Sequence, residues 1–152
     1  PFFVEKEAGF KPDAWLMADA GYNAYSTIIE TMADTVANKP EVVQCFVDGS
    51  AIGWYNFLYG DNSKAVAMIK ADNPEMSDEA IAFSIAALKE HGIVDSGDAE
   101  TMGIGAMTDA HMDEFYASMV KAGVLPDGVD IRKGYTLQFV NKKTGIELRP
   151  AQ

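Results

Sequence analysis

The sequence predicts a helix-rich α/β fold with few strands, and two kinds of pattern support this. Three stretches carry apolar residues at the three- and four-residue spacing of amphipathic helices, at 40–59, 77–91 and 108–122, and a fourth helix is predicted at 64–72, after the capping residues 60–63. Three shorter stretches predict strands, because they are apolar or rich in β-branched residues, at 14–18, 25–32 and 135–140. Three strands are few for a sheet that covers four helices. We therefore expect either a small α+β unit or a sheet whose other strands lie outside this sequence.

The predicted helices begin at recognisable residues. Pro40 is suited to a first helical position, with Asn38 as a candidate cap just before it. Ser77 and Thr108 precede two of the apolar repeats and are good N-cap residues. The first nine residues predict a short amphipathic turn or helix end that stops at Gly9.

Composition excludes several classes of partner and site. The chain has 152 residues and a formal net charge of −11, which argues against nucleic acid or an anionic membrane surface as partner. No stretch approaches the roughly 20 apolar residues of a membrane span. Cys45 is the single cysteine, so no intramolecular disulfide can form, and we expect it to be a buried thiol. The chain begins at Pro1 and shows no signal peptide, so we expect a processed or trimmed start.

A catalytic or metal-binding set is not evident. His91 and His111 lie on different predicted helices, and only Glu114 stands at a helical spacing from one of them. No nucleophile elbow, Cys–His pair or dinucleotide-binding glycine motif occurs, and we predict no metal and no cofactor. The acidic residues Asp95 and Asp98 are expected to belong to a solvated loop.

The stretch 18–25 is dense in polar and aromatic side chains that could contact a ligand. It holds a carboxylate, an amide and two phenols within seven residues, namely Asp19, Tyr22, Asn23 and Tyr25, and Gly21 allows a tight turn among them. Two interpretations remain open. The stretch is either a hinge that contacts a ligand or an ordinary turn whose tyrosines cap a core.

Several segments, in order, resemble the solute-binding proteins of ABC importers, in the group that includes binders of the thiamine pyrimidine precursor, riboflavin, nitrate, sulfonates and taurine. Individually each segment is a weak match, and their order and spacing over nearly the whole chain carry the resemblance. They are residues 16–22 with Tyr25, then 38–48, 53–61, 92–99, 103–109 and 135–141.

This resemblance implies the C-terminal portion of a two-lobed periplasmic-binding-protein type 2 fold. Residues 1–18 would end the second lobe, 19–25 would form the return hinge, and 26–152 would be the C-terminal part of the first lobe. It implies ligand binding without catalysis, with Asp19, Tyr22, Asn23 and Tyr25 contacting a small pyrimidine-like ligand. The implied partners are an ABC permease of the inner membrane and a missing N-terminal half. The implied location is the periplasm, or the outer face of the membrane by a lipid anchor in a Gram-positive cell.

Two alternatives stay open. Eukaryotic pyrimidine synthases share this fold and act as enzymes, but they carry a cysteine-rich motif and a key histidine, and this chain has no cysteine cluster. The other alternative is a structural or interaction domain that binds no small molecule and is complete at 152 residues.

Overall fold

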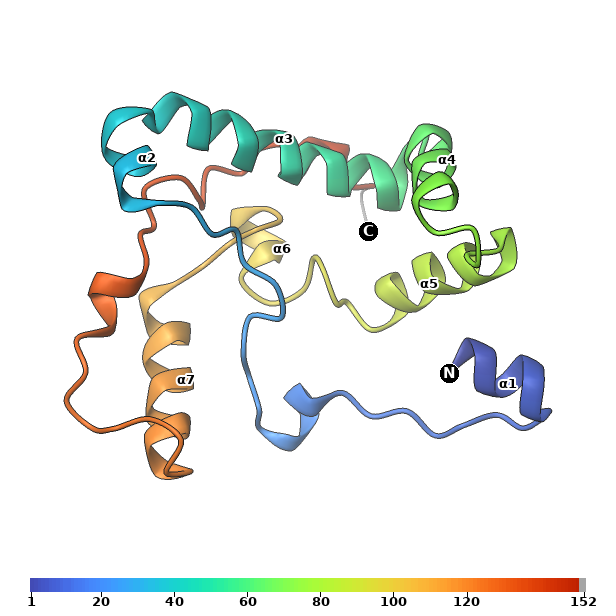
Figure 1. Ribbon diagram of the computed structural model, residues 1–152, viewed down its shortest axis with the longest axis horizontal. Coiled ribbons are helices and arrows are strands. Elements are labelled where there is room, and N and C mark those ends of the chain that lie inside the picture. The colour runs from blue at the N-terminus through green and yellow to red at the C-terminus, as the bar shows by residue number, and fades with distance from the viewer. Residues whose placement is uncertain (151–152) are drawn as a thin grey trace.

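The computed structural model describes residues 1–150, and within that range all regular structure is helical (Figure 1). The described residues form seven α-helices and three short 3-10 helices, one between α1 and α2 and two after α7. The α-helices are α1 (Phe2–Ala8), α2 (Ala33–Asn38), α3 (Pro40–Tyr59), α4 (Ser63–Asp72), α5 (Asp78–Glu90), α6 (Ala99–Met102) and α7 (Asp109–Lys121). The 3-10 helices are η1 (Met17–Ala20), η2 (Ile131–Gly134) and η3 (Ile146–Leu148). The expectation of a helix-rich chain is confirmed.

The predicted helix signals are mostly confirmed. Pro40 occupies the first position of α3, where its missing N–H costs nothing. The Ser77 hydroxyl accepts a hydrogen bond from the Ala80 N–H at 3.1 Å at the start of α5. Gly9 ends α1 in the left-handed region at φ 72°. Asn38 is not the cap of α3, because it is the last residue of α2, a helix that the sequence pattern did not predict.

The three predicted strands are wrong for residues 1–150, and each has a local reason. Within 14–18, Met17 and Ala18 belong to η1, which Gly21 closes with φ 90°. Residues 27–31 have no regular structure, and their backbone groups make no hydrogen bonds to other described residues. Within 135–140, the Val140 N–H bonds to the Leu137 carbonyl and forms a turn. A strand needs a neighbour to pair with, and the described chain offers none.

The core is small and centres on α3. Tyr55 on this helix is fully buried, and its hydroxyl accepts a hydrogen bond from the Ile104 N–H at 3.2 Å. The C-terminal segment runs back along α3, where Phe139 is buried and its carbonyl accepts from Gln44 at 3.1 Å. The other buried apolar residues are Val43, Ala51, Leu58, Ala80, Ile81, Ala99 and Ala106.

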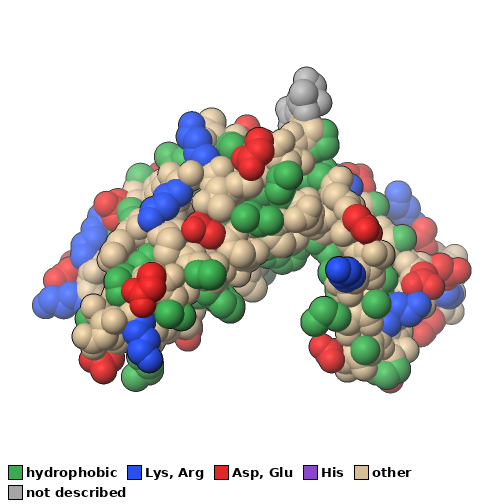
Figure 2. All heavy atoms as spheres, turned by 90° about the horizontal axis from the view of Figure 1, so that it is seen from above, with side chains coloured by type: hydrophobic (Ala, Val, Ile, Leu, Met, Phe, Trp, Pro, Cys, Tyr) green, Lys and Arg blue, Asp and Glu red, His purple; other side chains and the backbone are tan. Residues whose placement is uncertain are grey.

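The helices form an arch around an open concave side. In Figure 1, α3 crosses the top, α2 and α7 lie at one end, and α4, α5 and α1 lie at the other. Residues 10–32 return below α3 from α1 to α2 (Figure 1). Seen from above, the atoms form two arms with a wide opening between them (Figure 2). The returning segment connects α1 at one end of the molecule with α2 at the other (Figure 1).

The chain exposes far more surface than a compact protein of its mass. Its accessible area is 10597 Å², whereas a compact monomer of this mass exposes about 7,500 Å². Large apolar side chains contribute to this surface, as at Trp15 and Met32, which are 82% and 74% exposed. Cys45 is also exposed, so the expectation of a buried thiol is wrong. Only the buried faces of α3 and its neighbours behave as a core.

Candidate functional site

The candidate site begins at a tight turn in the returning segment. In η1, the Asp19 N–H donates to the Leu16 carbonyl at 3.1 Å, and the Gly21 N–H donates to the Ala18 carbonyl at 2.9 Å. The Tyr22 N–H then closes the turn on the Met17 carbonyl at 3.0 Å. Gly21 suits this position because its φ of 90° is unfavourable for a residue with a Cβ. The turn leaves Asp19 exposed to solvent.

Tyr25 fastens the end of this stretch to the start of α7. Its hydroxyl oxygen accepts a hydrogen bond from the Thr108 N–H at 2.9 Å. Its ring stacks on the imidazole of His111, with centroids 4.1 Å apart and an interplanar angle of 31°. Because the hydroxyl accepts from Thr108, its own hydrogen remains available to another acceptor.

His111 is the centre of this contact, which we call the α7 clasp: Asn23, Tyr25, Asp98, Thr108 and His111. The Nε2 of His111 lies 3.0 Å from the Asn23 carbonyl oxygen. A carbonyl only accepts, so Nε2 carries the hydrogen. The other nitrogen, Nδ1, lies 3.9 Å from the Asp98 carboxylate. The imidazole thus lies between the returning segment and Asp98 at the start of α6.

Thr108 completes the clasp from the helix end. Its hydroxyl accepts from the His111 N–H at 3.2 Å, as an N-cap should, and donates to the Asp98 carboxylate at 3.0 Å. The sequence pattern identified Thr108 as a cap and favoured a surface or helix-end position for His111, which lies in the first turn of α7. No pattern in the sequence indicated the contacts of the His111 imidazole, because they are made with residues distant along the chain.

Tyr22 contacts α7 farther along the helix than Tyr25 does, and fewer interactions hold its side chain. Its ring meets Phe115 edge-on, with centroids 5.8 Å apart, and the residue is 41% exposed. The structure therefore brings Tyr22, Asn23 and Tyr25 onto one side of α7. Asp19 lies within the η1 turn, and its carboxylate has no hydrogen-bond partner within residues 1–150. The ligand-binding role of all four remains a prediction.

A second polar cluster was missed because it joins residues far apart in the sequence. Asp95 was expected in a solvated loop but is only 3% exposed. Its carboxylate accepts a hydrogen bond from the Tyr59 hydroxyl at 2.5 Å and lies 3.4 Å from Nε of Arg149. Burial, followed by the hydrogen bond to Asp95 and its negative charge, raises the pKa of Tyr59. This cluster ties the C-terminal segment to α3.

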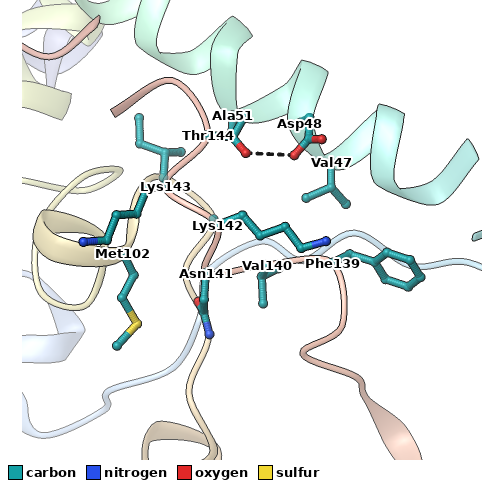
Figure 3. A pocket seen from close by; sticks show the side chains of 12 residues that line it. Val47, Asp48, Ala51, Met102, Phe139, Val140, Asn141, Lys142, Lys143 and Thr144 are labelled. Atoms are coloured by element: carbon teal, nitrogen blue, oxygen red, sulfur yellow. Dashed lines mark hydrogen bonds between the residues drawn. The ribbon is translucent and has the colours of Figure 1, made fainter. Parts of the chain in front are cut away.

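The cavity beside α3 is too small for a ligand. It lies between that helix and residues 139–144, where the Thr144 hydroxyl donates to the Asp48 carboxylate at 2.9 Å (Figure 3). Its volume of about 10 Å³ matches roughly one water molecule. The candidate ligand residues are not part of its lining.

Metal-binding and membrane-spanning features are absent from the described residues. Residues 1–150 contain no group of three or more His, Cys, Asp or Glu side chains placed to hold a metal ion. None of the helices found in that range is long and apolar enough to cross a membrane. Comparison of the chain with protein-family models, curated proteins and solved structures found no match.

Proposed function

We propose that this chain is the C-terminal part of a solute-binding protein of an ABC importer, with the two-lobed periplasmic-binding-protein type 2 fold. It captures a small, pyrimidine-like heteroaromatic ligand between the lobes and delivers it to a permease. Asp19, Tyr22, Asn23 and Tyr25 supply the ligand contacts of the hinge. The supporting observation is the returning segment, which runs from α1 to α2 and is held on α7 through residues 22–25.

The residues on the two sides of Gly21 are held differently, as expected for a hinge. Tyr25 and the Asn23 carbonyl are held on α7 by Thr108 and His111. On the other side of Gly21, η1 contains only its own turn hydrogen bonds and has no buried residue. Hinges absorb backbone change in a few residues between rigid elements. Gly21, at φ 90°, is suited to that role.

The excess surface supports a chain that is one part of a larger clamp. An area of 10597 Å² exceeds by roughly 3,000 Å² the value for a compact monomer. A stable interface takes about 800 Å² from each partner. The excess area is therefore large enough for several such interfaces, including one with another lobe of a binding protein.

The side chains of the hinge suit a flat ligand with ring N–H or amino groups. The exposed Asp19 carboxylate can accept hydrogen bonds from such donors. Tyr22 presents a half-exposed ring to stack on, and Tyr25 retains a hydroxyl hydrogen to donate. From the resemblance we propose a periplasmic location, or a lipid anchor on the outer face of a Gram-positive cell, with an inner-membrane ABC permease as partner. No cofactor and no nucleic acid belong to this proposal.

The test is a thermal-shift titration of the whole protein with a panel of heterocycles, sulfonates and amino acids. A ligand that binds only the folded state stabilises it by about 2.7 kcal/mol at one hundred times its Kd. We expect a rise in Tm with a pyrimidine-like compound and a rise at least halved in Asp19→Asn and Tyr22→Ala. Asp13→Asn is the matched control, since Asp13 is exposed in the same segment. No shift with any member of the panel would count against ligand capture, and turnover of a bound compound would favour the enzyme alternative.

A further inference from the structure

The most incomplete part of the molecule is residues 26–32, just after the α7 clasp. Every residue from Ser26 to Met32 is exposed. The backbone N–H and C=O groups of 27–31 have no hydrogen-bond partner within the described chain. Four of the seven residues are β-branched, and Met32 has an extended backbone at φ −71° and ψ 141°. Sequence preference and exposed backbone therefore both favour a strand that lacks its neighbours.

An apolar groove runs beside this stretch. Its volume is about 230 Å³, and its walls come from 29–31 on one side and from α2 and α3 on the other. The residues that line it are Ile29, Glu30, Thr31, Thr35, Val42, Val43 and Phe46. Ile29, Val42 and Phe46 are 49%, 54% and 62% exposed. Exposed apolar surface next to unpaired backbone is the surface on which an added strand docks.

The charges around the groove favour a basic segment over a second copy of this chain as the occupant. Glu30 lines it, and Asp34 and Glu41 stand in the first turns of the two helices behind it. Lys39 is the basic residue between those helices. A second copy of the chain would bring the same acidic residues and a further net charge of −11 to this place. A strand with basic residues at its ends is favoured instead.

We propose that residues 26–32 and the groove form a docking site for an extended β-strand of a second polypeptide segment, apolar at alternate positions and flanked by basic residues. The strand pairs with the backbone of 27–31 and places alternate side chains against Ile29, Val42 and Phe46. The proposal rests on the proposed function only for the source of the strand, which would be the other half of the binding protein.

The test uses the 152-residue chain and a capped peptide, Lys-Thr-Val-Thr-Val-Thr-Lys, with hydrogen exchange as readout. We expect exchange at the amides of 27–31 to slow at least tenfold on saturation. A peptide N-methylated at alternate residues, or one with glutamate in place of lysine, should bind at least tenfold more weakly. Ile29→Ser should weaken binding by a similar factor, while the matched control Ile93→Ser should not, since Ile93 is 48% exposed in another part of the chain.

Three results would overturn the proposal. They are unchanged exchange at saturating peptide, equal binding of the N-methylated peptide, and protection of 27–31 that depends on self-association of the chain without peptide. Heteroaromatic ligand binding is measured separately by thermal shift. A failure of strand docking is therefore distinguishable from a failure of the proposed function.

Discussion

The rings of Tyr25 and His111 stack with their centroids 4.1 Å apart, although the two residues are far apart in the sequence. The contact is strengthened by two hydrogen bonds that flank it, from the Thr108 N–H to the Tyr25 hydroxyl and from His111 to the Asn23 carbonyl. Stacking fixes the ring planes and the hydrogen bonds fix the backbone. Together they determine where the returning segment meets α7.

Replacing Tyr25 with phenylalanine tests the hydroxyl alone. The Thr108 N–H would lose its acceptor while the ring contact with His111 remains. We expect a loss of about 1 kcal/mol in the free energy of unfolding, the usual cost of an unsatisfied polar group. Urea denaturation measures this change. Tyr22→Phe is the control, because the Tyr22 hydroxyl makes no hydrogen bond to any residue in 1–150, and an equal loss in both variants would contradict the clasp.

Replacing His111 with phenylalanine tests the imidazole nitrogens. The ring is retained, but the donor to the Asn23 carbonyl and the nitrogen facing Asp98 are lost. We expect the Thr108 amide to exchange several-fold faster, since its acceptor, the Tyr25 hydroxyl, is then held by fewer contacts of the returning segment. Exchange monitored by mass spectrometry or NMR reports this directly. His91→Phe is the matched control, as His91 is exposed at the end of α5, and unchanged exchange in His111→Phe would show that the imidazole nitrogens do not hold the segment.

Helix existence was predictable from the sequence because its signals are local. Pro40, Ser77 and Thr108 mark the helix starts by chemistry within a few residues. The short helix α2 was not predicted, because it has only six residues. The β-branched residues that precede it favoured a strand instead. Strand existence was not predictable in the same way, since a strand depends on a partner at a distance in the sequence.

The sequence predicted the part of the candidate site in residues 19–25 but not the part contributed by α7. The density of polar and aromatic groups drew attention to Asp19 and Tyr25. Nothing in the sequence paired Tyr25 with His111, because the contact requires the turn at Gly21 and the position of α7. The burial of Asp95 was hidden for the same reason, as its cation, Arg149, comes from the far C-terminal segment.

Removing the buried carboxylate of Asp95 should be among the most damaging single changes. Asp95→Ala would leave the Arg149 guanidinium, whose side chain is 19% exposed, without its partner. Breaking such a pair costs about 3 kcal/mol or more. The exposed pair of Lys133 and Asp130 supplies the control, since Asp130→Ala should cost less than about 0.5 kcal/mol. Similar losses in the two variants, measured by urea denaturation, would show that the Asp95 cluster is not a buried one.

The Tyr59 hydroxyl predicts how stability changes at alkaline pH. Burial, then the hydrogen bond to Asp95, raises its pKa in the folded state above the ordinary value of 10.0. A raised pKa means that the stabilisation is fully present below pH 10 and is lost as the pH rises through the folded-state pKa. We expect one tyrosine to titrate late in ultraviolet absorbance and to disappear from the titration in Tyr59→Phe. Stability that falls equally at alkaline pH in wild type and Tyr59→Phe would argue against this assignment.

Two separate effects favour glycine at position 145, the left-handed backbone conformation and the lack of room for a Cβ atom. Experiment can distinguish them. The φ of Gly145 is 77°, and a Cβ there would lie 3.0 Å from Cδ2 of Tyr55, the fully buried residue of the core. Gly145→Ala should therefore cost about 1–2 kcal/mol for the left-handed backbone and about 1–3 kcal/mol more for the overlap. Gly128→Ala isolates the first contribution, because Gly128 has φ 80° and no atom within 4 Å of the position that a methyl group would take. A larger loss at Gly145 in urea denaturation places the C-terminal segment against Tyr55, whereas equal losses would mean that the segment moves aside to admit the methyl group.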